Sequence, residues 1–179
     1  MSAGSDSAVA GKAAVAPVLV LAYGNPSRGD DALAPRLLER LEKKQADAAA
    51  LNHVELLTDF QLQVEHAIDL QQRKCVLFVD ASVSAGAPFE FCPLQAERDD
   101  SYSSHAMSPQ AVLAVYREIN RLEPPPSYLL AIRGYRFELG EGLSEQAEKN
   151  LAQAESFVSD WLRHGGQVAE QKAGIRVTT

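Results

Sequence analysis

The chain has 179 residues, of which 17 are Lys or Arg and 24 are Asp or Glu, so its formal net charge is −7. This length predicts one domain whose core is large enough to fold without disulfides. The acidic balance excludes a general nucleic-acid binder and disfavours adhesion to anionic lipid, because both need a basic surface. We therefore expect neither nucleic acid nor membrane among the partners.

Cysteine content and the two chain ends indicate the compartment and the domain bounds. Two cysteines are too few for a disulfide framework. The first residues lack the features of a secretory signal, and the longest apolar run is too short for a membrane helix. We expect a cytoplasmic protein with a disordered leader over residues 1–16, one domain over 17–164 and a flexible tail over 165–179.

Strands and helices alternate in the first half of the chain. A continuous apolar run over residues 18–23 predicts a strand buried on both faces. Leucines at helical spacing follow from Leu33 to Leu41. A second strand, a second helix and another buried strand are then predicted over residues 54–57, 63–72 and 75–79, with Asp80 at the carboxyl end of the last.

The second half continues the alternation and indicates the fold. We predict an edge strand over residues 88–92, a helix over 108–121, a strand over 128–132 and a last helix from about residue 144. Ser108 and Pro109 are a typical helix start, with Ser as the cap. The pattern predicts an α/β fold, in which helices form two layers around a mostly parallel central sheet. Ligand sites in such sheets lie at the carboxyl ends of the strands.

The loop after the first strand, from Gly24 to Asp31, is the first candidate site. Its two glycines, five positions apart, suggest a phosphate loop, but two aspartates follow where such a loop needs Lys and Ser or Thr. Carboxylates there would repel phosphate and instead suit a cation. The side chains of Asp30 and Asp31 diverge, so only one faces a given point. The alternative is that one simply caps the helix.

Asp80 and His105 are further candidates for the same edge of the sheet. His105 precedes the helix start at Ser108. Carboxylates and an imidazole suit a first-row divalent ion such as nickel or zinc, and three protein ligands leave positions open for substrate. A cap or turn role for Asp80 is the alternative. A second possible metal pair is His66 with Asp69, three apart on a helix, although a surface pair is commoner.

Several stretches of this sequence resemble a known family. They are VLVLAYGNPSRGDDALAPRLLERL, FQLQVEHAIDL, CVLFVDASVS, SHAMSPQAVLAV and IRGYRFELGEGLS. Together they are similar to the [NiFe]-hydrogenase maturation endopeptidases over about residues 17–161, and most of all to members that serve NAD-linked soluble hydrogenases. The resemblance implies a three-layer α/β/α fold. It also implies a peptidase that removes the C-terminal extension of the hydrogenase large-subunit precursor after nickel insertion.

The resemblance also implies the site residues of an aspartate-containing peptidase. Two acids and a histidine of the family bind nickel, or zinc or cadmium in its place, and by position they are Asp31, Asp80 and His105. Several members have Glu where this chain has Asp31. Some place the histidine just after the Ser-Pro, where this chain has Gln110.

Gly24 and Asn25 are expected to shape the first loop. Asn25 is also a candidate donor to a developing oxyanion. The alternative for this Gly-Asn-Pro stretch is a plain turn.

The expected mechanism is recognition of a nickel ion that the substrate largely supplies. Hydrolysis then follows either from a carbonyl or water activated by the ion, or from a carboxylate such as Asp31 acting as general base. Two other functions stay open: a non-enzymatic nickel-sensing chaperone of the precursor, and a generic metal-dependent hydrolase. A monomer is expected for a protease that visits a large precursor.

Overall fold

The computed structural model describes residues 14–47, 51–98 and 107–166. Most of the predicted leader and tail therefore lies outside the described residues, and so does His105. Within the described ranges, no helix is both long and apolar enough to cross a membrane.

A five-stranded sheet with the strand order β2-β1-β3-β5-β4 forms the middle of the molecule. Its strands are β1 (Val18–Tyr23), β2 (Val54–Asp59), β3 (Cys75–Ser82), β4 (Phe89–Leu94) and β5 (Ser127–Arg133). The first four in spatial order are parallel, and β4 runs antiparallel to β5 at the edge. The predicted mostly parallel sheet is thus confirmed, with β4 as the predicted edge strand.

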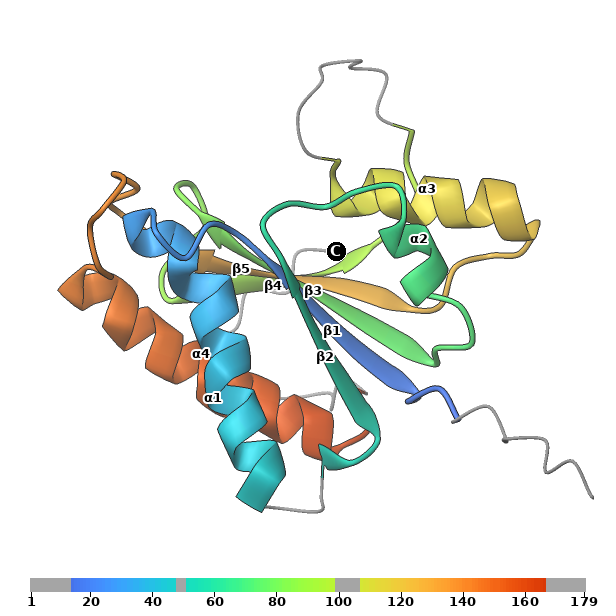
Figure 1. The fold of residues 1–179 in the computed structure, drawn as a ribbon, viewed down its shortest axis with the longest axis horizontal. Coiled ribbons are helices and arrows are strands. Elements are labelled where there is room, and N and C mark those ends of the chain that lie inside the picture. The colour runs from blue at the N-terminus through green and yellow to red at the C-terminus, as the bar shows by residue number, and fades with distance from the viewer. Residues whose placement is uncertain (1–13, 48–50, 99–106, 167–179) are drawn as a thin grey trace, which may run out of the picture.

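Helices cover both faces of this sheet. They are the short 3₁₀ helix η1 (Gly29–Ala32) and the α-helices α1 (Leu33–Asp47), α2 (His66–Asp69), α3 (Pro109–Asn120) and α4 (Glu145–Arg163). Figure 1 shows α1 and α4 on one face and α2 and α3 on the other. The predicted three-layer α/β fold is therefore confirmed.

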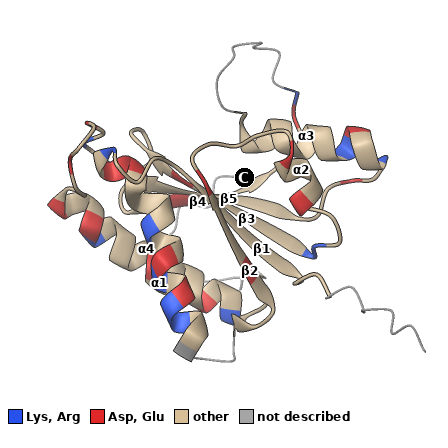
Figure 2. Cartoon of the chain, in the orientation of Figure 1, with Lys and Arg blue, Asp and Glu red and all other residues tan. Residues whose placement is uncertain are grey.

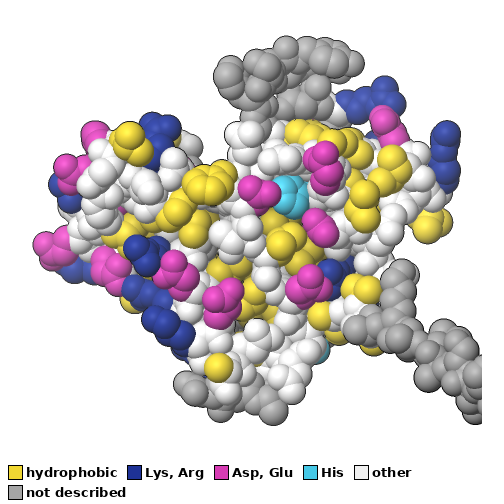
Figure 3. All heavy atoms as spheres, in the orientation of Figure 1, with side chains coloured by type: hydrophobic (Ala, Val, Ile, Leu, Met, Phe, Trp, Pro, Cys, Tyr) yellow, Lys and Arg dark blue, Asp and Glu magenta, His cyan; other side chains and the backbone are white. Residues whose placement is uncertain are grey.

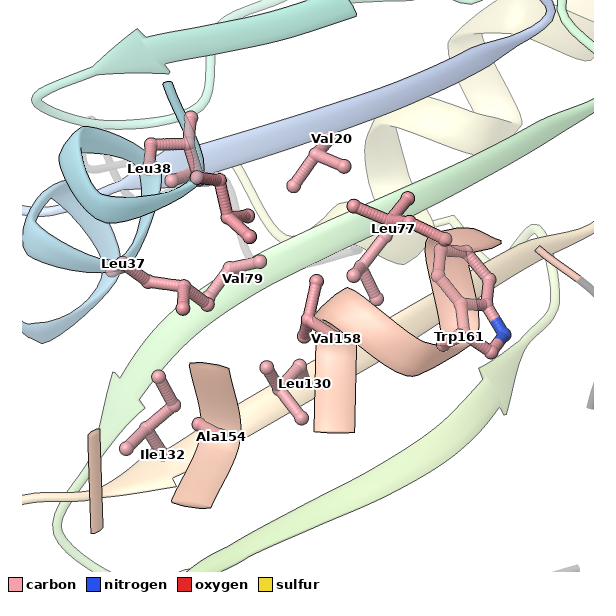
Figure 4. Packing of buried hydrophobic residues seen from close by; sticks show 14 of the residues in the cluster. Val20, Leu37, Leu38, Leu77, Val79, Leu130, Ile132, Ala154, Val158 and Trp161 are labelled. Carbon is pink, nitrogen blue, oxygen red and sulfur yellow. The ribbon is translucent and has the colours of Figure 1, made fainter. Parts of the chain in front are cut away.

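The apolar core lies in two parts, one on each face of the sheet. Side chains alternate along a strand, so Val18 and Val20 of β1 pack toward α1 and α4, while Leu19 and Leu21 pack toward α2 and α3. The larger part is drawn in Figure 4 and includes Leu37, Leu77, Val79, Leu130, Val158 and Trp161. This burial on both faces explains why the strands are continuous apolar runs.

Ion pairs link α1 to α4 at the surface of their layer, where Figure 2 marks acidic and basic residues along the helices. Arg40 contacts Glu148 and lies 3.2 Å from Glu155, and Lys44 lies 2.7 Å from Glu155. Exposed pairs of this kind contribute at most about 1 kcal/mol each. The apolar core therefore stabilises this layer far more than the ion pairs do.

Several predicted bounds differ from those in the structure, most of all those of the second helix and the third strand. The helix predicted over residues 63–72 is only the single turn α2, because Gln72 adopts a left-handed backbone with φ of 64°. At its other end, the His66 ring accepts the Gln63 N–H. The strand predicted to end at Val79 continues to Ser82, because its parallel partner β5 pairs with it that far. Asp80 therefore lies within β3, near its carboxyl end.

Candidate functional site

The carboxyl ends of β2, β1 and β3 place three polar side chains in a row. Tyr23 is the register partner of Asp59, and the pairing of Ala22 with Val79 brings Tyr23 beside Asp80. Tyr23 packs against the same core as Leu19 and Leu21, and Asp80 alternates with residues that pack on the opposite face. Asp59, Tyr23 and Asp80 thus share the sheet face that α2 and α3 cover.

Asp80 is a half-buried carboxyl group in contact with Tyr23. Burial, as the main cause, raises the pKa of Asp80 from 3.8 to about 7, and the negative charge of Asp31 adds to the effect. Hydrogen bonds from the Ala81 backbone and the Tyr23 hydroxyl oppose this rise in the pKa. Burial and the Asp80 charge raise the pKa of Tyr23, so the phenol remains a donor at neutral pH.

Asp31 lies on η1, and its charge acts on this carboxyl group. Its Oδ2 accepts the backbone N–H of Asn25 at 2.8 Å, which holds the carboxylate over the first loop. The charge of Asp31 contributes to the raised pKa of Asp80. Asp31 and Asp80, two of the three predicted metal and catalytic residues, thus lie at the same edge of the sheet.

The loop from Gly24 to Asp31 depends on a glycine at its start. Gly24 has a φ of +150°, and a Cβ there would collide with the Asp31 carbonyl oxygen. Its N–H donates to the Asp59 carbonyl at 3.1 Å, which ties the loop to β2. The Asn25 Oδ1 accepts the Ser27 N–H at 2.9 Å, as in an Asx turn. Gly24 and Asn25 therefore shape the loop that carries Asp31.

Asp30 lies apart from the candidate site, although it is adjacent to Asp31 in sequence. It is fully buried and accepts four hydrogen bonds, from the N–H groups of Tyr135, Arg136 and Ser144 and from the Ser144 hydroxyl, at 2.7–3.0 Å. Burial acts to raise the pKa of Asp30, but these hydrogen bonds outweigh it and lower the pKa. Neither aspartate caps η1, since its N-cap, Arg28, has no side-chain cap bond. Asp30 instead holds the segment after β5 against η1.

His66 faces Asp59 rather than forming the metal pair considered with Asp69. The ring is buried, with Nε2 at 3.3 Å from Asp59 Oδ2 and Nδ1 accepting the Gln63 N–H at 2.9 Å. Among the residues that the structure describes, no three His, Cys, Asp or Glu side chains are grouped closely enough to hold a metal. A third ligand beside Asp31 and Asp80 thus stays a prediction, because His105 lies outside the described ranges.

The sequence interpretation missed two members of this row, Tyr23 and Asp59. Tyr23 is the last residue of an apolar run, and alternation from Leu19 and Leu21 would have placed it on the α2–α3 face. Asp59 lies two residues beyond the predicted end of its strand. Extending both strands by their alternation was the signal that could have identified them.

The three-layer fold belongs to the α/β class, in which ligand sites lie at the carboxyl edge of the sheet, and two carboxylates lie at that edge here. Solved structures that share this fold identify the class more narrowly. The hydrogenase maturating endopeptidase HybD from Escherichia coli is 25% identical to this chain, with a TM-score of 0.63. The match covers 83% of this chain and 93% of HybD.

Two archaeal structures show the same fold at lower identity. The [NiFe] hydrogenase maturation protease HycI from Thermococcus kodakarensis KOD1 is 21% identical, with a TM-score of 0.59, over 83% of this chain and 93% of its own. A hydrogenase 2 maturation peptidase from a Thaumarchaeota archaeon is 22% identical, with a TM-score of 0.57, over 84% of this chain and 99% of its own. No protein-family model and no curated protein sequence matches the chain. The resemblance to the [NiFe]-hydrogenase maturation endopeptidases is confirmed by these structures, and this chain has their fold.

Proposed function

We propose that this chain is an endopeptidase that removes the C-terminal extension of a [NiFe]-hydrogenase large-subunit precursor after nickel insertion. The observation that supports this most is the neighbouring pair Asp31 and Asp80, at the carboxyl edge of a fold shared with hydrogenase maturation proteases. The site is acidic and half-buried, which suits a cation presented by a protein substrate.

Recognition of the nickel in the precursor is the role that we propose for the two carboxylates. One carboxylate oxygen of Asp31 accepts a hydrogen bond from the Asn25 N–H. Asp80 is partly protonated near neutral pH because burial and a neighbouring charge raise its pKa. A cation between the two would relieve their repulsion and displace that proton. His105 is the proposed third ligand, and zinc or cadmium would substitute for nickel at such a site.

Hydrolysis adds one water across the scissile peptide bond, and two routes fit the site. In one, the substrate's nickel polarises the carbonyl or lowers the pKa of a bound water. In the other, a carboxylate removes the proton from the attacking water. Asp31 is the proposed base when Asp80 binds the ion. Without an ion, Asp80 has a pKa closer to the working pH of a general base.

Incubation with the purified precursor tests this function. We expect mass spectrometry to show loss of the C-terminal extension from the nickel-loaded precursor, and no loss from the nickel-free one. Stable binding without cleavage would instead support a nickel-sensing chaperone. Turnover of small esters or amides with no cleavage of the precursor would support a generic metal-dependent hydrolase.

The choice of hydrogenase and the working state of the protein are also proposals. We propose a precursor of an NAD-linked soluble hydrogenase as substrate, and a cytoplasmic monomer as the active species. Cleavage should be faster for that precursor than for the precursor of a membrane-bound hydrogenase. Light scattering should give the mass of one 19.4 kDa chain.

A further inference from the structure

The connection from β2 to β3 leaves three large apolar side chains in solvent beside the candidate site. Phe60, Val64 and Ile68 are 66%, 51% and 58% exposed. They follow Asp59, the register partner of Tyr23, whose hydroxyl contacts Asp80. We call residues 59–70 the α2 surface. Apolar side chains grouped in this way beside a site are typical of a contact with a partner.

The charge of the α2 surface has one sign. Asp59, Glu65 and Asp69 lie within it, and the sequence has no Lys or Arg from residue 59 to residue 72. The next cation, Arg73, is nearly buried, and its guanidinium lies 2.6 Å from Glu55. Figure 3 shows acidic and apolar side chains next to one another in this region. A partner segment that complements such a surface carries basic and apolar side chains.

The exposed side chains belong to a segment that is already held in place by buried contacts. Leu62, Ala67 and Leu70 are buried in the core between the sheet and α3. The Met107 N–H donates to the Leu62 carbonyl at 3.3 Å, and the buried His66 ring links the turn to Asp59. A surface held in this way loses little conformational entropy when a partner binds.

We propose that the α2 surface docks a basic segment with apolar side chains that belongs to the protein substrate, away from its scissile bond. This inference rests on the proposed function, because the docked protein is the one whose peptide bond reaches Asp31 and Asp80. A second copy of this chain fits less well, since a symmetric contact would bring like acids together. Gly166, the last described residue, lies against Cys75, whose side chain packs in the core on the other face of the sheet, with α1 and α4.

Steady-state cleavage of the nickel-loaded precursor tests the docking surface. The double variant Val64→Ser with Ile68→Ser, and separately Glu65→Lys, should each lower kcat/KM about tenfold, mainly through KM. Higher salt should lower the kcat/KM of the wild type more than that of Glu65→Lys, because the contact is partly electrostatic. The matched control is Ile119→Ser with Leu122→Ser, which changes two residues 54% and 65% exposed near the C-terminal end of α3, outside the α2 surface, and should keep the wild-type kcat/KM.

A photo-crosslinking amino acid at position 68 then identifies the occupant. A cross-link to a segment of the precursor that is richer in Lys and Arg than in Asp and Glu supports the proposal. A link to an acidic segment, to a second copy, or to residues 1–13 or 167–179 of the same chain overturns it. If the wild type cleaves and both docking variants cleave equally well, only this inference fails. If the wild type does not cleave, the proposed function itself fails.

Discussion

Two adjacent aspartates in this chain have different environments and different consequences. Asp30 is fully buried and accepts four hydrogen bonds from the segment after β5 and the start of α4. Asp31 is half-buried, accepts the Asn25 N–H and influences the pKa of Asp80. The first is a structural anchor, and the second lies in the candidate site.

The amides of these two aspartates should therefore separate stability from activity. Asp30→Asn places an NH₂ group against backbone donors and should lower the free energy of unfolding by about 3 kcal/mol. Asp31→Asn should lower it by less than about 1 kcal/mol and abolish precursor cleavage. Urea unfolding followed by circular dichroism, with a cleavage assay, measures both. An Asp31→Asn variant that is as unstable as Asp30→Asn would contradict this division.

The half-buried carboxyl of Asp80 predicts a pH dependence of stability in the absence of metal. Burial raises the pKa of Asp80 to about 7, above the ordinary value of 3.8, so the folded state binds the proton more tightly. The contribution of this proton to the free energy of unfolding is fully present below about pH 4 and is lost as the pH rises through about 7. The Asp80→Asn variant should not show this loss. Between pH 5 and pH 8 its free energy of unfolding should therefore rise relative to that of the wild type by on the order of 2 kcal/mol. Equal pH profiles in urea unfolding would refute this.

At the scale of elements, the turn between β1 and η1 holds the candidate site together. Gly24 begins it with a positive φ, its N–H binds the carbonyl of Asp59, and the Asn25 N–H binds Asp31. The loop thus aligns the end of β1 with the end of β2 and with the carboxylate of η1.

Gly24→Ala should disturb the site more than the rest of the fold. The added Cβ meets the Asp31 backbone in a conformation that L-residues rarely adopt, so the loop must shift. We expect a loss of about 2 kcal/mol in the free energy of unfolding and more than a tenfold loss of cleavage. Gly142→Ala is the matched control, because a Cβ there has open space, and it should leave both quantities near the wild-type values.

The elements also show why the sequence predicted some bounds and not others. Hydrophobic runs such as residues 18–23 correspond to real strands, because both faces of the sheet are covered. The length of α2 was wrong, because it depends on the backbone of Gln72 and on the ring of His66, which apolar spacing does not report. The end of β3 was also wrong, because its polar residues stay in the strand through their pairing with β5.

For the whole molecule, the order of the parallel strands explains where the candidate site lies. Placing β1 between β2 and β3 brings the ends of all three to one edge. The sequence predicted this edge, and it predicted Asp31 and Asp80 through a family resemblance. It did not predict which sheet face the polar row occupies, because the face follows from strand register. Tyr23 and Asp59 were missed for that reason.

We propose that the Asp31 and Asp80 carboxylates recognise nickel in a hydrogenase precursor and permit its cleavage. Mass spectrometry of the nickel-loaded precursor after incubation with wild type, Asp31→Asn and Asp80→Asn tests it most directly. We expect loss of the C-terminal extension with the wild type alone, while both variants stay folded by circular dichroism. Full processing of the precursor by Asp80→Asn would contradict it.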